Sequence, residues 1–156
     1  IAGAAAFTDA YVKSLRALAK GNRRIHFVGL QTGRKLAALY RGARVTVQPS
    51  ESEGLSLVVL EAIAASPRVL VSGIPENLEI VDDFVPTFRS GDVVDLTRKL
   101  SQALKPNTPT LSKETKATLL APYQWGAITK ETAKVYRVLV ATKKKVAVPA
   151  LRRAVI

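Results

Sequence analysis

Two glutamates separated by seven residues are the side chains of this sequence best suited to chemistry. Glu53 and Glu61 end the run EGLSLVVLE, and Glu61 is the only charged residue between Leu55 and Ala65. This composition predicts a helix that is buried nearly all round, where an isolated carboxylate is costly to desolvate. We therefore expect Glu61 either to meet a neutralising partner within the protein or to face a polar ligand in a cleft.

The residues just before this helix are suited to a phosphorylated sugar. Gly54 has no side chain to keep a ligand away from the backbone. The helix that follows offers free N–H groups and the positive end of its dipole to a phosphate. Glu53 either accepts hydrogen bonds from sugar hydroxyls or acts as a plain helix N-terminal acid. If the whole segment is helical, Glu53 and Glu61 lie about 12 Å apart along the axis, enough to reach from a hexose to a ribose.

The elements that must position these residues alternate between β-like and helical patterns, which predicts a parallel sheet covered by helices. Four or five strands are expected, near 1–5, 24–29, 45–49, 68–72 and 87–89. Helices are expected near 8–20, 32–42, 55–65, 75–81, 91–104, 112–121 and 125–142. Ligands of such sheets bind beyond the carboxyl ends of the strands, so the loops at 29–31 and 50–56 are predicted to share one rim.

Composition restricts the class of protein. At 156 residues the chain has the length of one typical domain. No apolar stretch approaches the ~20 residues of a membrane span, and no basic region precedes the first residues as in a signal peptide. The chain begins on Ile1 and has no Met, which indicates a fragment or a trimmed chain. It has no Cys and one His, so we expect no metal site.

The charge balance is strongly basic, with 24 Lys and Arg against 12 acids, a net charge of +12. Such a field favours anionic partners, whether nucleotides, nucleic acid or lipid headgroups. Lys143, Lys144 and Lys145 open a basic tail at 143–156. The tail is either simply solvated or in contact with an anionic membrane surface or nucleic acid. We expect a cytoplasmic protein, peripheral at the inner membrane face if the tail binds lipid.

The ordered series of motifs resembles the donor-binding half of retaining glycosyltransferases with the GT-B fold, and within them family 4, the glycosyl transferases of group 1. The hallmark of that family is Glu-x7-Glu in a fixed context. Its counterparts here are Pro49, Ser50, Glu53, Gly54, Leu57, Leu60, Glu61, Ala62 and Ala64. IPENLEIV and YQWGAITKETAKVYRVL resemble later family segments, so the resemblance extends to about Val140.

The resemblance implies a Rossmann-like domain at 1–142 that binds a UDP- or GDP-sugar as substrate, without a cofactor. It implies that Glu53 is catalytic and contacts the donor sugar, and that Glu61 binds the nucleotide ribose. The backbone of Gly54, Leu55 and Ser56 would meet the sugar and diphosphate. Gly29, Leu30 and Gln31 would lie near the base. The acceptor, a saccharide or a lipid-linked one, would be held by an N-terminal domain that this chain lacks.

Three departures from the family pattern stand out. Ser56 replaces a usual glycine, and Ser66-Pro67-Arg68-Val69 replaces the common Gly-x-Pro-Val. The first strand–loop–helix of the domain, which carries a basic pair that grips the diphosphate, would also lie upstream. Losing two charge-assisted hydrogen bonds weakens binding by about 3–6 kcal/mol. We therefore expect this chain alone to bind donor weakly and to transfer nothing, within a full-length retaining hexosyltransferase.

Two other functions stay open at this point. A basic non-enzymatic α/β domain could bind nucleic acid through its charge, although that function favours interleaved aromatics and aromatics are only 6% of this sequence. A GT-B relative without transferase activity, such as an epimerase or a regulatory subunit, would also fit the substitutions at Ser56 and Arg68.

Overall fold

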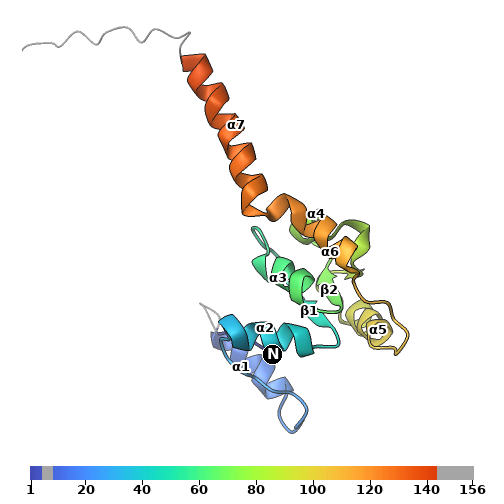
Figure 1. Cartoon of the computed structure of the whole chain (residues 1–156). Helices are drawn as coiled ribbons and strands as arrows, with labels where there is room; N and C mark the ends of the chain where they lie inside the picture. The colour runs from blue at the N-terminus through green and yellow to red at the C-terminus, as the bar shows by residue number, and fades with distance from the viewer. Residues whose placement is uncertain (5–8, 144–156) are drawn as a thin grey trace, which may run out of the picture. The chain divides into compact units, whose positions relative to one another are not determined.

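The computed structural model describes residues 1–4 and 9–143, which belong to two compact units, Ile1–Thr110 and Leu111–Ile156. Each unit is described by itself. The elements of the first unit are α1 (Asp9–Leu18), α2 (Gly33–Gly42), β1 (Thr46–Gln48), α3 (Leu57–Ala65), β2 (Val69–Ser72), α4 (Pro75–Val81), η1 (Asp82–Phe84), β3 (Thr87–Phe88) and α5 (Val93–Ala103) (Figure 1). Those of the second are α6 (Lys113–Leu120), η2 (Ala121–Tyr123) and α7 (Trp125–Lys143).

A parallel sheet forms the centre of the first unit. Its strands lie in the order β1-β2-β3, with Val47 beside Leu70 and Val71 beside Thr87. All four residues of β2 are buried, as expected for a strand covered on both faces by helices. The predicted fold class, an α/β protein with a parallel sheet flanked by helices, is confirmed.

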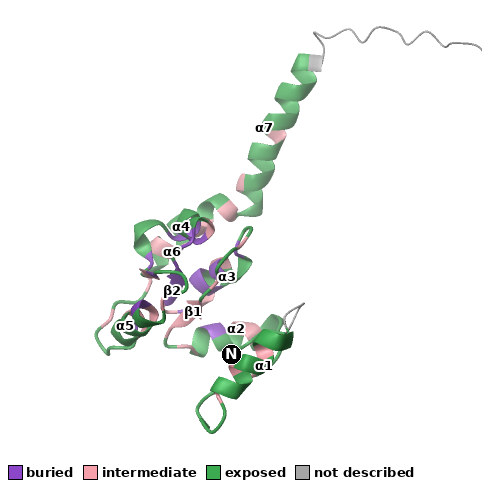
Figure 2. Cartoon of the chain, turned by 180° about the vertical axis from the view of Figure 1, so that it is seen from behind, coloured by how far each residue is buried: buried purple, intermediate pink, exposed green. Residues whose placement is uncertain are grey.

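The apolar core lies between the sheet and the helices that cover it. α3 contacts β1 and β2, whereas α5 contacts β2 and β3, and in Figure 1 the two helices lie on either side of β2. Burial is greatest along α3, β2 and α4, while α1 has no buried residue (Figure 2). The residues of the first unit that are almost fully buried include Val59, Ile63, Val69, Leu70, Val71, Ile80 and Val81.

The strand predicted at 24–29 is wrong for most of its length. Only Gly29 forms a bridge, parallel to Ala2, supported by hydrogen bonds from the Val28 N–H to the Ile1 carbonyl and from the Gly3 N–H to the Gly29 carbonyl, both 2.9 Å. Among the described residues only Ala2 pairs with this segment, through a single bridge to Gly29, so no continuous ladder forms there.

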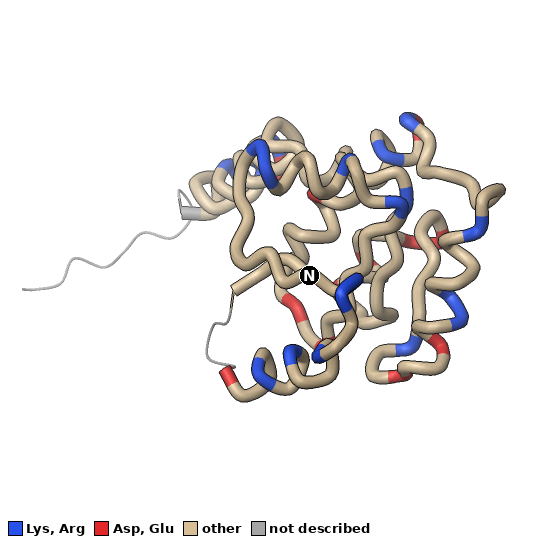
Figure 3. The backbone as a smooth tube through the Cα atoms, turned by 90° about the horizontal axis from the view of Figure 1, so that it is seen from below, with Lys and Arg blue, Asp and Glu red and all other residues tan. Residues whose placement is uncertain are grey.

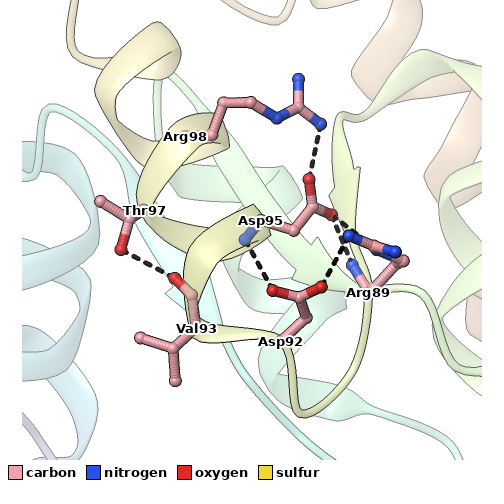
Figure 4. Close-up of polar contacts among 6 residues, drawn as sticks. All are labelled: Arg89, Asp92, Val93, Asp95, Thr97 and Arg98. Atoms are coloured by element: carbon pink, nitrogen blue, oxygen red, sulfur yellow. Dashed lines mark hydrogen bonds and ion pairs between the residues drawn. The ribbon is translucent and has the colours of Figure 1, made fainter.

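The start of α5 is fixed by an acidic cap and two arginines (Figure 4). Asp92 Oδ1 accepts a hydrogen bond from the Asp95 N–H at 2.8 Å, so Asp92 caps the helix. The Asp95 carboxylate accepts hydrogen bonds from the Arg89 N–H at 2.8 Å and from Arg98 at 2.5 Å. These contacts, the Arg89 N–H first, hold the pKa of Asp95 below its usual value.

Two arginines hold the segment after α5 against the beginnings of β1 and β2. Arg44 donates to the Leu104 carbonyl at 2.9 Å. Arg68 donates from two nitrogens to the Thr108 carbonyl. Arg68 immediately precedes β2, so this substituted position lies at the end of the sheet opposite the carboxyl ends of its strands.

The second unit is helical. Ser112 caps α6 by accepting a hydrogen bond from the Thr115 N–H at 3.1 Å. Several large apolar residues of α7 are exposed, among them Trp125, Val135, Tyr136 and Leu139. Within the described residues, no helix is both long and apolar enough to cross a membrane. Lys and Arg lie on α1, α2, α5, α6 and α7 and in the loops between elements (Figure 3), and nearly all of the predicted tail at 143–156 lies outside the described residues.

Candidate functional site

The loop after β1 places the Glu53 carboxylate at the carboxyl ends of the strands. Glu53 is half-buried, and its Oε1 accepts hydrogen bonds from Ser50 Oγ at 2.6 Å and from Gln48 Nε2 at 3.0 Å. Gln48 Nε2 also donates to Ser50 Oγ at 2.7 Å. No hydrogen bond reaches Oε2 from the described residues. One oxygen of Glu53 is thus anchored, and the other is available to a ligand.

The same loop is tied to the neighbouring strand. The Ser50 carbonyl accepts a hydrogen bond from Ser72 Oγ at 2.5 Å and a longer one, 3.4 Å, from Ser90 Oγ. Ser72 is the last residue of β2, and Ser90 follows β3. Side chains from all three strand ends therefore converge on Ser50, which itself holds Glu53.

The backbone between Glu53 and α3 is open to solvent at Gly54 and Leu55, both exposed. A Cβ at Gly54 would meet no atom within 4 Å, so the protein's own packing does not require glycine there. Ser56 is only 2% exposed, and its Oγ has no hydrogen-bond partner among the described residues. Its side chain therefore points into the protein and does not obstruct the open side of the loop.

Glu61 lies on the solvent-facing side of α3. The prediction that this helix is buried nearly all round is wrong, because Leu57, Val58 and Glu61 are exposed while Val59, Ala62 and Ile63 are buried. The segment from Glu53 to Ser56 is also not helical, so the 12 Å spacing expected along one helix axis does not apply. The sequence does not show which face of the helix is buried, because valine and alanine occur on both the buried and the exposed face.

Tyr40, near the end of α2, is the partner of Glu61. Its hydroxyl donates a hydrogen bond to Glu61 Oε2 at 3.2 Å. Burial, followed by the nearby Glu61 charge, raises the pKa of Tyr40 to about 12, so the phenol keeps its proton and remains a donor. No cation pairs with Glu61 among the residues that the structure describes, and Oε1 accepts no hydrogen bond from them.

A cavity of about 930 Å³ brings Glu61 together with the loop after residue 28. Its lining includes Leu30, Gln31, Tyr40, Gln48 and Glu61. Gly29 has a φ of +68°, a left-handed conformation that glycine adopts without strain, and it turns the chain there. Gln31 Nε2 then donates to the Val28 carbonyl, while Leu30 stays 69% exposed.

Glu53 does not line this cavity, but Gln48 joins the two parts of the site. The Gln48 side chain lines the cavity and its amide donates to Glu53. The sequence analysis did not identify Gln48 or Tyr40 as site residues. Gln48 lies in the strand predicted at 45–49 and Tyr40 in the helix predicted at 32–42, and neither position carries a motif of its own. Within residues 1–4 and 9–143, no group of three or more His, Cys, Asp or Glu could hold a metal ion.

Comparison with known proteins identifies relatives of one kind. The family model described as glycosyl transferases group 1 matches residues 1–118. A sulfoquinovosyl transferase of Arabidopsis thaliana is 39% identical over 85 residues, which are 50% of this chain and 16% of that protein. An uncharacterized glycosyltransferase of Methanocaldococcus jannaschii is 30% identical over 144 residues, 88% of this chain and 36% of the relative.

Among solved structures, sucrose-phosphate synthase from Thermosynechococcus elongatus superposes with a TM-score of 0.73 at 26% identity. The match covers 85% of this chain and 35% of that one. The chain therefore spans at most about a third of the length of these relatives.

Proposed function

Because this chain belongs to the glycosyl transferases of group 1, we propose that it is the donor-binding domain of a retaining, family 4 hexosyltransferase. The donor is a UDP- or GDP-sugar, bound as substrate. The observation that best supports this proposal is shared by the two glutamates. Each has one carboxylate oxygen anchored by the protein, through Ser50 and Gln48 or through Tyr40, while the other accepts no hydrogen bond from the described residues. A carboxylate held this way is a directed acceptor for sugar hydroxyls.

The proposed roles are those that the family resemblance implies, and the places of the residues in the structure support them. Glu53, beside the exposed backbone of Gly54 and Leu55, contacts the donor sugar. The backbone of Gly54 to Ser56, just before α3, and the N-terminus of that helix receive the diphosphate through N–H groups and the helix dipole. Glu61 binds the ribose, and Leu30 and Gln31, which line the same cavity, lie with Gly29 against the base. In retaining transfer the substrate's own phosphates do much of the acid–base work.

Glu53 also has an electrostatic role. Positive charge develops on the sugar as the glycosidic bond breaks, as in other glycosyl-transfer reactions with oxocarbenium-like transition states. A fixed anion near that charge stabilises the transition state more than the ground state. The hydrogen bonds to Oε1 keep the Glu53 carboxylate oriented without any rearrangement at the moment of reaction.

The rest of the enzyme supplies what this chain does not. We propose that an N-terminal domain holds the acceptor, either a saccharide or a lipid-linked one, and that the upstream basic pair grips the diphosphate. The enzyme would be cytoplasmic, and the basic tail at 143–156 could bring it to the inner membrane face.

The first experiment is an amide NMR titration of this chain with UDP-glucose and with GDP-mannose to millimolar concentration. Single-stranded DNA serves as the control. The proposal expects shifts confined to Gly29–Gln31, Glu53–Ser56 and Glu61, larger with one base than with the other. Broad shifts with DNA and no response to either nucleotide would contradict it and favour the nucleic-acid alternative.

A second experiment separates a transferase from a GT-B relative that has lost transfer. Glu53→Ala in the full-length protein should abolish sugar transfer to the acceptor while nucleotide still binds through Glu61. Undiminished transfer by that variant would rule out the role assigned to Glu53.

A further inference from the structure

Asn77, in the first turn of α4, is a fully buried amide with one polar atom left unpartnered. Its Nδ2 donates to both the carbonyl oxygen and Oγ of Ser72, each at 3.1 Å. Its Oδ1 is buried and accepts no hydrogen bond from the described part of the chain. An unsatisfied buried acceptor is unfavourable for stability. Local departures of this kind concentrate at functional sites, so a role besides packing is expected for Asn77.

The amide of Asn77 fixes the direction of the Ser72 hydroxyl. Because Ser72 Oγ accepts from Asn77 Nδ2, its single proton is free to point elsewhere. That proton goes to the Ser50 carbonyl, at an Oγ–O distance of 2.5 Å. Ser72 and Asn77 are both 0% exposed, so water does not compete for these contacts.

Ser50 then transmits this placement to Glu53. Its hydroxyl accepts from Gln48 and donates to Glu53 Oε1 at 2.6 Å. With its carbonyl held from β2 and its hydroxyl held by Gln48, Ser50 has little freedom to rotate or to move. Hydrogen bonds thus connect buried Asn77 to Ser72, Ser72 to Ser50, and Ser50 to the Glu53 carboxylate.

We propose that Ser72 and Asn77 are positioning residues for Glu53. Their hydrogen bonds hold the loop after β1 in place, so that Glu53 Oε2 faces the donor sugar in one orientation. The inference rests on the proposed function, since it requires Glu53 to contact the donor. It adds two residues that touch neither substrate nor the reacting atoms.

The test uses kcat and the donor KM of the full-length transferase. Ser72→Ala removes the hydroxyl and adds no atoms, so the Ser50 carbonyl in the loop loses its hydrogen bond from Ser72 Oγ. A misplacement of about 1 Å can cost as much as a hundredfold in rate, so we expect kcat to fall about 10- to 100-fold, with the donor KM changed less than twofold.

Asn77→Leu separates positioning from stability. It replaces the amide by an apolar side chain of similar size and removes the unpartnered Oδ1. It also removes the donor to the buried Ser72 carbonyl, and the two changes oppose each other. We therefore expect unfolding in urea to occur near the wild-type concentration, while kcat falls as in Ser72→Ala. Wild-type kcat in Asn77→Leu would overturn the role of Asn77.

Ser66→Ala is the matched control. Ser66 is also 0% exposed, and its Oγ donates to the Tyr40 carbonyl at 3.1 Å, away from Ser50. The two serine-to-alanine changes therefore delete the same group from equally buried positions. Ser66→Ala should keep kcat within twofold of the wild type; equal losses of kcat in Ser66→Ala and Ser72→Ala would overturn the inference.

A double-mutant cycle identifies the residue through which Ser72 acts. If Ser72 acts only through Glu53, then Ser72→Ala combined with Glu53→Gln transfers no more slowly than Glu53→Gln alone. Multiplying losses would overturn this inference and leave the proposed function intact. A Glu53→Gln variant with wild-type kcat would instead overturn the proposed function, and the inference with it.

Discussion

Replacing Tyr40 by Phe should weaken nucleotide binding by releasing one oxygen of Glu61. The change removes a single hydroxyl, whose one hydrogen bond to the described residues is the 3.2 Å bond to Glu61 Oε2. A hydrogen bond of this kind contributes about 1 kcal/mol net, so we expect the Kd for the preferred nucleotide sugar to rise about fivefold. The ring of Tyr40 remains, and the packing of α2 against α3 should be unchanged.

The affinity is read from the same amide titration, performed on the wild type and on Tyr40→Phe side by side. A fivefold loss should appear without any change in which amides shift. Leu39→Ala is the control for disturbance of α2, because Leu39 also lines the cavity but has no polar contact with Glu61. It should alter affinity less than Tyr40→Phe.

The dependence of stability on alkaline pH tests independently whether the Tyr40 hydroxyl is buried. The pKa of Tyr40 is about 12 in the folded chain and near its ordinary value of about 10 when unfolded. Between these values the folded state retains a proton that the unfolded state has lost, so Tyr40 lowers stability as the pH rises from about 10. Urea unfolding should therefore show a shallower alkaline decline in Tyr40→Phe. A shallower decline with an unchanged Kd would refute the argument that Tyr40 prepares Glu61 for a ligand.

Three further outcomes concern the scaffold. Leu70→Ala, at a fully buried position of β2, should lower the free energy of unfolding by about 2–5 kcal/mol, measured by urea denaturation; a smaller loss would mean that the core there collapses readily. Arg68→Ala should cost about 1–3 kcal/mol by releasing the segment around Thr108, yet leave nucleotide affinity unchanged in the titration. Asp95→Asn should reduce the loss of unfolding free energy at acid pH. The pKa of Asp95 is lowered on folding, so the stabilisation by its carboxylate is present above the pKa of the unfolded state and is lost as the pH falls. An unchanged acid dependence of the unfolding free energy would argue against that account.

The sequence predicted the sheet well where local and tertiary preferences agree. RVLVS has β-branched and apolar residues throughout, and β2 is buried on every residue. The helix starting at Pro75 was also predicted correctly, because the effect of proline on a helix start lies within one turn. The strand at 24–29 failed for a non-local reason, since a strand exists only if another strand pairs with it along its length.

The site was predictable only in part. The loops at 29–31 and 50–56 were located from the positions of strand ends and glycines. The partners of the glutamates were not, because Tyr40 lies 21 residues before Glu61 and Ser72 lies 22 residues after Ser50. Such contacts depend on how α2, α3 and β2 pack together. The exposed face of α3 was missed for the same reason: nine mostly apolar residues do not reveal which face of the helix meets the sheet.

The separate anchoring of the two glutamates has a consequence for protein engineering. Glu53 is secured from within its own loop and from the strands, whereas Glu61 is secured from α2 by Tyr40. No described hydrogen bond joins one carboxylate to the other's anchor. Substitutions around residues 29–40 and around residues 50–56 can therefore be varied in separate libraries, provided that Gln48, which lines the cavity and also donates to Glu53, is kept unchanged.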